Sequence, residues 1–340
     1  MQKIEELANK FHGKKILVVG DMIADVYLQG NIARISREAP VLVLEEKNKN
    51  VVAGGAANVV ANLAEFGGDV YAFGMVGNDL YGEELKNILT RHKVHVEGII
   101  TDKTRPTISK IRVIAGGRAT VSQQIVRIDR EDKNPPSEEI QAELINQINK
   151  ILPNIDGIVL SDYGSNTITA EVKKFVIDYA AKNKIPSMVD SRYNIGDYEG
   201  IGFVKQNDSE LAAFVEKPIT DLNSLISAGN ELLNKLKADG VLITRGEKGM
   251  TLFERGGAVN HIPVSNVSEV FDVSGAGDTC IAAFILGLAA NLSPVVSARI
   301  SNYASGIAVR KLGTSTVNIN ELIDVLAKEN FIDRGYLNAD

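Results

Sequence analysis

Short apolar runs rich in β-branched residues recur along the chain, separated by longer segments with helical periodicity. Ile16–Gly20 and Val241–Ile243 are continuous apolar runs of the kind that is buried on both faces of a parallel sheet. In Leu80–Lys93, by contrast, the apolar residues recur at the spacing of one helix face. This alternation of strands and helices predicts an α/β protein built on a doubly wound sheet.

Two segments interrupt that alternation. Within Asn31–Glu46 a short apolar run, Pro40–Leu44, is flanked by charged residues and predicts a short strand where a helix would otherwise follow the first strand. Thr107–Ile128 alternates apolar and polar residues around a glycine pair, which predicts a hairpin. We expect these segments, about residues 29–50 and 105–130, to form a small β subdomain.

The composition is that of a globular protein of 340 residues, 44% hydrophobic, and we expect a single main domain over residues 1–340. The formal net charge of −6 comes from interspersed acids and bases, so nucleic acid is not an expected partner. Met1–Lys15 lacks the apolar core of a signal peptide, and no run of about 18 apolar residues occurs, so we expect a cytoplasmic protein without a membrane segment. The single cysteine, Cys280, is expected to be a small buried side chain.

Polar and glycine residues follow several predicted strands, where open α/β sheets keep their ligands. Asp21 and Asp25 come after the first strand and either bind a ligand or cap a turn. Gly54–Asn58 opens a helix, and its glycines permit close approach of a ligand or tight packing; the amide of Asn58 favours a ligand site. The loop Arg245–Gly249 either cradles phosphates or is an ordinary hairpin turn.

The segment Phe271–Cys280 carries the strongest chemical signal. Apolar residues after it, at positions 281, 284, 285 and 288, predict a helix that begins near Gly275 and packs one stripe into the core. The free N–H groups and the dipole of that helix start suit an anion, and the small side chains leave room for one. Asp278, on the first turn, is placed to take a proton from an attacking hydroxyl, and we expect the dipole to keep it ionised; the other interpretation is that it only favours the helix start.

Two of these segments together resemble a known family. Asp272–Thr279 is similar to the C-terminal signature of the ribokinase-like (PfkB) carbohydrate kinases, and Gly54–Asn58 is similar to their N-terminal glycine motif. The two occur in the family's order and separation, and the resemblance covers nearly the whole chain. It implies a three-layer α/β/α ribokinase-like sandwich with a small β-sheet lid, a reaction between ATP and a sugar, Mg²⁺ and K⁺ as cofactors, and a homodimer formed through the lid.

The resemblance also implies roles for individual residues. Asp278 is the catalytic base, and the anion hole consists of Gly275, Ala276 and Gly277. Sugar-binding positions are Asp25, Gly54, Gly55 and Asn58. The nucleotide is bound by Asn207, Thr244, Gly246 and Gly249; Mg²⁺ lies near Asn207 and Glu210, through water, and a monovalent cation lies at Asp272.

A closer resemblance is to the subfamily of these kinases that phosphorylates D-glycero-D-manno-heptose 7-phosphate at C1. It rests on segments outside the general signatures, namely Gly20–Asp21, Arg34–Val41, Pro106–Val113, Leu160–Tyr163 and Lys311–Val317. A phosphorylated sugar would give the bases of the β subdomain a purpose, and the candidates for its 7-phosphate are Arg105, Lys110, Arg112 and Arg127. Some kinases of this subfamily are fused to a nucleotidyltransferase domain, which we do not expect in this chain.

The chain departs from the subfamily around the expected nucleotide phosphates. Ser165 stands where a lysine is common, Asp190–Arg192 replaces Asp-Pro-Lys, and Lys205–Asn207 replaces Thr-Pro-Asn. We expect Arg192 or Lys205 to restore the lost positive charge at the nucleotide. Two other functions remain open, another PfkB-type sugar kinase of the fructokinase or ribokinase kind, and a sugar or nucleotide sensor without turnover. A dinucleotide oxidoreductase is disfavoured because no G-x-G-x-x-G follows a strand.

Overall fold

A nine-stranded sheet forms the centre of the computed structural model, which describes residues 2–116, 122–265, 271–329 and 331. The strand order is β13-β12-β11-β10-β9-β8-β1-β4-β5, parallel from β11 to β5 and antiparallel at β12 and β13. The strands are β1 (Lys15–Gly20), β4 (Asp69–Gly77), β5 (His95–Asp102), β8 (Gly157–Asp162), β9 (Ser187–Ser191), β10 (Phe203–Asn207), β11 (Gly240–Thr244), β12 (Met250–Glu254) and β13 (Val259–Ile262).

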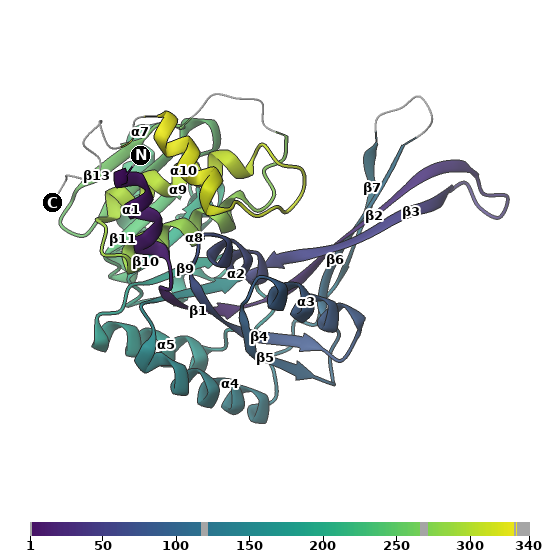
Figure 1. Cartoon of the computed structure of the whole chain (residues 1–340), viewed down its shortest axis with the longest axis horizontal. Coiled ribbons are helices and arrows are strands. Elements are labelled where there is room, and N and C mark those ends of the chain that lie inside the picture. Colours follow the sequence, from purple (N-terminus) through teal and green to yellow (C-terminus); the bar gives the residue numbers. More distant parts are fainter. Residues whose placement is uncertain (1, 117–121, 266–270, 330, 332–340) are drawn as a thin grey trace.

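Helices cover both faces of this sheet, giving three layers (Figure 1). Alternate residues of β1 enter the two cores, Ile16 and Val18 on one face and Leu17 and Val19 on the other. The first face packs against α1 (Gln2–Phe11), α2 (Ala56–Glu65), α3 (Leu80–Arg91), α8 (Ala276–Ala289), α9 (Pro294–Ala308) and α10 (Ile319–Lys328). The second packs against α4 (Glu138–Ile151), α5 (Ala170–Asn183), α6 (Asp208–Phe214) and α7 (Leu222–Leu236). The predicted α/β/α sandwich is confirmed.

The order of the strands fixes where a ligand can bind. From β1 the chain proceeds outward to β4 and β5, and it then returns to β8 on the other side of β1 before continuing towards β13. The direction of winding therefore reverses between β1 and β8. Loops leave the carboxyl ends of those two strands in opposite directions, which opens a crevice at the edge of the sheet.

A second, four-stranded sheet projects from this body (Figure 1). We call it the projecting sheet; its order is β3 (Leu42–Gly55), β2 (Met22–Ile35), β6 (Ile108–Gly116) and β7 (Gln123–Arg130). The predicted hairpin at 107–128 is present as β6 and β7, with residues 117–121 outside the described part of the chain. The predicted short strand at 40–44 is wrong in extent, because β2 and β3 pair over 14 residues each. Charged residues exposed on the outer half of these strands hide the alternation that marks a half-buried strand.

Helix α8 differs from its prediction. The sequence predicts one buried stripe, but the residues from Asp278 to Ala289 are buried all round, Cys280 among them as expected. The helix lies between the central sheet, α2 and α9, so no side of it faces solvent. Its first turn is therefore held rigidly at the carboxyl edge of the sheet.

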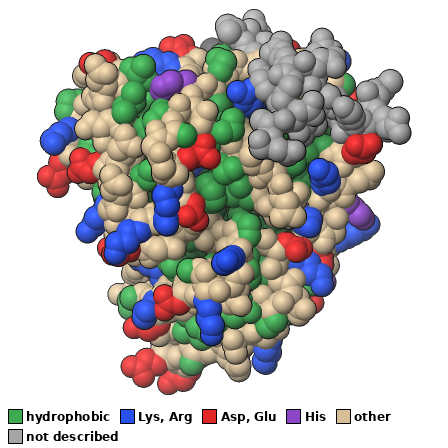
Figure 2. Space-filling model, turned by 90° about the vertical axis from the view of Figure 1, so that its left-hand side faces the viewer, with side chains coloured by type: hydrophobic (Ala, Val, Ile, Leu, Met, Phe, Trp, Pro, Cys, Tyr) green, Lys and Arg blue, Asp and Glu red, His purple; other side chains and the backbone are tan. Residues whose placement is uncertain are grey.

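The surface charges and the lengths of the helices can be compared with the expectations from composition. On the face shown in Figure 2, acidic and basic side chains are interspersed over the sheet edge and the helices beside it. None of the helices in the described ranges combines the length and the apolar character that crossing a bilayer requires.

Candidate active site

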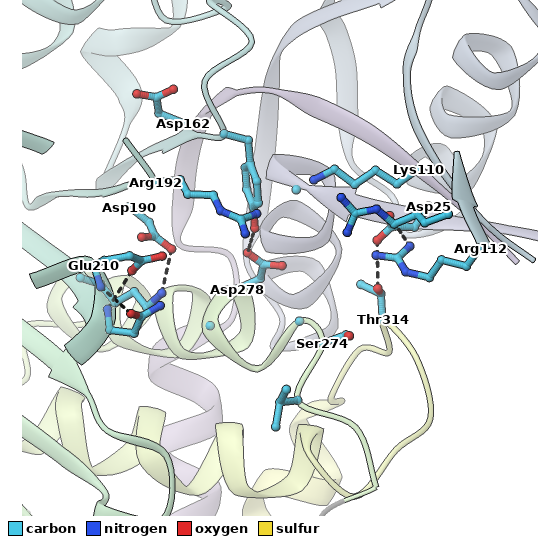
Figure 3. Close-up of a pocket in the computed structure, with 18 residues that line it drawn as sticks. Asp25, Lys110, Arg112, Asp162, Asp190, Arg192, Glu210, Ser274, Asp278 and Thr314 are labelled. Atoms are coloured by element: carbon cyan, nitrogen blue, oxygen red, sulfur yellow. Dashed lines mark hydrogen bonds and ion pairs between the residues drawn. The ribbon is translucent and has the colours of Figure 1, made fainter. Parts of the chain in front are cut away.

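A cavity of about 440 Å³ lies at the carboxyl edge of the central sheet, beneath the projecting sheet. Residues from β2, β6, β7, β9, β10 and the start of α8 line it, so segments far apart in the sequence meet there (Figure 3). Of the residues predicted from the sequence, its lining includes Asp25, Gly55, Lys110, Arg112, Arg127, Arg192, Lys205, Asn207, Glu210, Gly275, Gly277 and Asp278.

Asp278 lies in the middle of this cavity and is 6% exposed. Both its oxygens accept hydrogen bonds, Oδ2 from Asn58 Nδ2 at 2.7 Å and Oδ1 from the Tyr163 hydroxyl at 2.9 Å. Burial raises the pKa of Asp278 to about 6, although these two hydrogen bonds favour the ionised form. Asp278 is therefore still mostly ionised at neutral pH, as expected, but its pKa lies above the usual value, so the carboxyl loses its charge in mildly acidic solution.

The start of α8 is shaped by glycine. Gly275 caps the helix with a φ of 82°, a left-handed conformation, and a Cβ at this position would lie 2.8 Å from Asn58 Nδ2. A Cβ on Gly277 would lie 3.0 Å from Lys205 Nζ. Ala276 is the first residue of the helix, between them. Any larger side chain at Gly275 would displace Asn58 and with it one hydrogen bond to Asp278.

Charged groups from β9, β10 and α6 line one end of the cavity. Lys205 Nζ lies 2.9 Å from Asp190 Oδ2, and both side chains are largely buried. Burial opposes the charge on Lys205, but Asp190 and Glu210 outweigh it and raise the pKa of the amine. Burial raises the pKa of Glu210, although the nearby positive charge of Lys205 lowers it. Asn207 and Glu210 bond each other's backbone N–H at 2.8 Å, which fixes both at the start of α6.

This end of the cavity suits a hard divalent cation that is bound in part by its substrate. Asn207 and Glu210 present oxygen donors to the cavity, the donor type that Mg²⁺ prefers. Across the part of the chain that the structure describes, no group of three or more His, Cys, Asp and Glu is placed to enclose a metal ion. The two oxygen-bearing residues, Asn207 and Glu210, fit Mg²⁺, which commonly uses one or two protein groups, several waters and substrate phosphates.

The other end of the cavity is basic and borders the projecting sheet. Arg112 Nη1 lies 2.7 Å from Asp25 Oδ1, and Thr314 Oγ1 donates to Asp25 Oδ2 at 3.0 Å. Burial lowers the pKa of Lys110 despite the charge of Asp25, and Arg192 and Arg127 lower it further. Lys110 and Arg112 lie around Asp25 at this end (Figure 3). Arg127 is bonded to Asp129 at 2.8 and 2.6 Å, so these three cations face two carboxylates, an excess of positive charge that suits an anionic ligand.

Several predicted residues support the cavity from behind. Gly54 allows the Asp25 carboxylate to approach, because a Cβ there would lie 2.6 Å from Asp25 Oδ2. Asn58 is buried and acts on Asp278 through its hydrogen bond. Asp272 accepts the N–H groups of Ser274 at 2.8 Å and Gly313 at 3.0 Å; burial opposes its charge, but these bonds hold the pKa of its carboxyl below its usual value.

Other predicted residues lie away from the cavity lining. Arg105 is bonded to Asp102 at 2.7 Å and to the carbonyls of Asn134 and Pro135, so its guanidinium is already occupied. Thr244, Gly246 and Gly249 lie in and after β11, where the antiparallel pair of β11 and β12 makes the loop a hairpin. Asp21 caps the loop after β8 by accepting three backbone N–H groups.

Sequence reasoning gave no role to six residues of the cavity lining, and the three of them whose side chains contact other site residues are Tyr163, Asp190 and Thr314. Each lies within a segment that was noted only for its resemblance to, or departure from, the heptose-phosphate kinases. Tyr163 and Asp190 are 27 residues apart in sequence and contact Asp278 and Lys205, respectively. The sequence signal for these side chains was therefore their place in those compared segments. Only the fold shows what the side chains contact.

Comparison with known proteins decides the family. The model of the pfkB family carbohydrate kinases matches residues 13–321. The chain belongs to this family. It is accordingly an ATP-dependent sugar kinase, and the cavity between the start of α8 and the projecting sheet is its candidate active site.

Relatives support this assignment, and solved structures share the fold. The chain is 39% identical to the bifunctional protein HldE of Pelobacter propionicus over 96% of its own length, and 35% identical to HldE of Helicobacter hepaticus over 92%. It spans just under two thirds of those relatives, 66% and 64%. Phosphofructokinase-2 of Escherichia coli, in complex with substrates and products, has the same fold at a TM-score of 0.76, and ribokinase of Arabidopsis thaliana, with ribose and ATP, at 0.72. Each is 20% identical, and each comparison covers 93% of this chain and 99% of the other.

Proposed function

We propose that this kinase transfers the γ-phosphate of ATP to the C1 hydroxyl of D-glycero-D-manno-heptose 7-phosphate and gives the 1,7-bisphosphate. The observation that carries the proposal is the basic end of the cavity, where three cations, Lys110, Arg112 and Arg127, lie near two carboxylates, Asp25 bonded to Arg112 and Asp129 bonded to Arg127. A neutral sugar needs hydrogen-bond partners there but no excess of positive charge. A sugar that already bears a phosphate supplies the missing anion.

The resemblance of five segments to heptose-phosphate kinases supports this particular sugar phosphate. Two of those segments contribute to the acceptor end, since Lys110 and Arg112 belong to Pro106–Val113 and Thr314 belongs to Lys311–Val317. Arg105 lies in the same region but outside the cavity lining, where it is bonded to Asp102, so we omit it from the proposed phosphate site. The proposed 7-phosphate ligands are Lys110, Arg112 and Arg127.

In the proposed reaction Asp278 accepts the proton of the C1 hydroxyl as the oxygen forms a bond to the γ-phosphorus. The bond from that phosphorus to the β–γ bridging oxygen breaks, and ADP leaves. The N–H groups at the start of α8, with Lys205, stabilise charge on the transferring phosphoryl group, and Arg192 holds the nucleotide phosphates. When bound, Mg²⁺ neutralises charge on the β- and γ-phosphates; Asn207 and Glu210 are placed to hold it through water, and Asp272 to hold a monovalent cation such as K⁺.

The test is ADP release with a panel of acceptors, together with ³¹P NMR of the product. Heptose 7-phosphate is expected to be the best acceptor and to gain a phosphate at C1, and Asp278→Asn is expected to abolish turnover. Faster turnover of ribose, fructose or fructose 6-phosphate would assign the protein to another kind of pfkB kinase. Binding of the heptose phosphate without turnover under any nucleotide would identify a sensor.

A matched pair of arginines on β7 tests the acceptor phosphate site. Arg127 lines the cavity, is 48% exposed and is bonded to Asp129, whereas Arg130, similarly exposed at 55%, lies outside the cavity lining and faces Asp79 at 3.7 Å. Arg127→Met is expected to raise KM for heptose 7-phosphate by about 10-fold, the value of a charge-assisted hydrogen bond, and to change KM for unphosphorylated heptose far less. Arg130→Met removes the same charge and should leave both KM values unchanged. Equal effects of the two variants would contradict a phosphate site at Arg127.

We further propose that the projecting sheet acts as a lid over the sugar and pairs two subunits into a homodimer. Arg127 lines the cavity, so alternation along β7 turns Val126 and Ile128 to the opposite face, where they are 47% and 52% exposed. Ile35 and Val41 are exposed at the end of the same sheet. Light scattering of the wild type should give twice the chain mass, and the double variant Val126→Asp, Ile128→Asp should give the single mass; a monomeric wild type would refute the pairing.

A further inference from the structure

Tyr163 lies between the projecting sheet and Asp278 and has no part in the function proposed above. It follows β8, and its side chain reaches into the cavity. Its hydroxyl donates to Asp278 Oδ1 over 2.9 Å, and the Lys110 ammonium, on β6, lies 5.0 Å from the centre of its ring. The two ends of one side chain therefore contact the proposed base and a proposed ligand of the sugar phosphate.

The loop that carries Tyr163 is fixed by a buried carboxylate. Asp21, at the carboxyl end of β1, is 1% exposed and accepts the backbone N–H groups of Tyr163 at 2.8 Å, Ser165 at 3.2 Å and Thr167 at 3.3 Å. Three donors on one carboxylate restrict the loop strongly, since each bond lies in a site closed to water. The phenol is thus held against Asp278 without help from the substrate.

We infer that Tyr163 is a positioning residue for phosphoryl transfer: its hydroxyl orients the Asp278 carboxylate, and the face of its ring holds the Lys110 ammonium at the acceptor end. This inference rests on the proposed role of Asp278 as base. With Oδ1 held by Tyr163 and Oδ2 by Asn58, the plane of the carboxylate is set. A carboxylate offers about four lone-pair directions, so others are left to receive the sugar hydroxyl.

The charged groups around Asp278 give this arrangement a measurable signature. Burial and Asp190 favour the protonated carboxyl, whereas Asn58, Tyr163 and Lys205 favour the ionised one. Loss of the Tyr163 hydroxyl removes one of the three stabilisers and leaves both opponents in place. The pKa of Asp278 should therefore rise above its value of about 6, and the acid limb of the rate should follow it.

Two substitutions separate the hydroxyl from the ring. Tyr163→Phe keeps the ring and should move the acid limb of kcat up by about one pH unit, a shift within the value of a hydrogen bond to a charged group. That shift lowers kcat about 5-fold at pH 6 and little at pH 8.5, with KM for the phosphorylated acceptor unchanged. Tyr163→Leu also removes the surface under Lys110 and should raise that KM by about 3-fold or more, the value of a cation–π contact.

A second tyrosine that donates to a carboxylate supplies the control. Tyr198 is fully buried and donates to Asp162 at 2.7 Å, so Tyr198→Phe removes a phenol hydroxyl that does not touch Asp278. The acid limb of kcat against pH for Tyr198→Phe should keep the wild-type midpoint. Thermal melts should verify that each variant is folded. If Tyr163→Phe and wild type give superimposable pH profiles while Asp278→Asn is inactive, the inference is wrong and the proposed function stands. If Asp278→Asn retains turnover, the base itself is misassigned, and the role of Tyr163 is refuted along with it.

Discussion

Lys205 is a buried cation beside the start of α8, and its removal gives the sharpest test of the phosphate end of the site. Its ammonium is buried, lies 2.9 Å from Asp190, and would lie 3.0 Å from a Cβ on Gly277. One side of the charge therefore faces a carboxylate, and the other faces the helix start proposed to bind the transferring phosphoryl group. We predict that Lys205→Met loses both stability and activity.

The loss of stability follows from leaving one charge of a buried pair alone. Asp190 is 15% exposed in its side chain, and breaking such a pair costs about 3–5 kcal/mol. A chain of 340 residues has an unfolding entropy of about 0.7 kcal/mol per kelvin, so Tm should fall by about 4–7 °C. The ammonium also neutralises charge in the transition state, and loss of one such group should lower kcat/KM by about 100-fold.

The double variant Asp190→Asn, Lys205→Met separates these two effects. It removes the buried carboxylate that Lys205 contacts, although Glu210 still loses a positive neighbour, so part of the Tm loss should be recovered, whereas kcat/KM should stay about 100-fold below the wild type. Because Asp190 and Glu210 raise the pKa of Lys205, the amine stays charged at neutral pH. The double variant removes the opposing effects of Asp190 and Lys205 on the pKa of Asp278 together, so the loss should be similar at pH 6.5 and 8.5. Thermal melts and ADP release measure both quantities.

The control is a lysine in an exposed ion pair. Lys174 is 78% exposed and lies 2.7 Å from Asp178, so Lys174→Met should change neither Tm nor kcat/KM measurably. A double variant at Asp190 and Lys205 with kcat/KM within about 3-fold of the wild type would refute the phosphate role of the ammonium. A single variant as stable as the wild type would refute the buried pair.

Four further outcomes are expected. Asp278→Asn should be up to about 3 kcal/mol more stable than the wild type at pH 8. The raised pKa means that protonated Asp278 stabilises the wild type at low pH, and this stabilisation is lost as the pH rises from about 4 through about 6. Denaturant melts should therefore show the difference in stability at pH 8 but not at pH 4. Arg112→Met leaves Asp25 with an unpaired charge and should raise acceptor KM by 10-fold or more in steady-state kinetics. Glu210→Gln should raise the Mg²⁺ concentration for half-maximal activity by about 10-fold, measured by Mg²⁺ titration at fixed ATP. Asp272→Asn should remove any stimulation by KCl over tetramethylammonium chloride, and an equal response of variant and wild type would count against a cation at Asp272.

The layered fold could be predicted because its signal is local. Runs such as Ile16–Gly20 are apolar throughout since both faces of the central sheet are covered, and the helices show their buried side in their periodicity. The strands β2 and β3 escaped full prediction because their outer halves are exposed and charged, so pairing between backbones defines them rather than burial. The same limit applies to α8, whose complete burial depends on α2 and α9 packing on it.

For the candidate site, too, some features follow from neighbouring residues in the sequence and others from the tertiary structure. Sequence alone located the helix start at Gly275 to Gly277, and it pointed to Asp278 as the carboxylate beside them. Only the tertiary structure decided the charge state of that carboxylate, since its pKa depends on burial and on contacts with Asn58 and Tyr163, 220 and 115 residues away. The motif is a property of neighbouring residues, but the electric field at Asp278 is the sum over every chain segment that the fold brings to it.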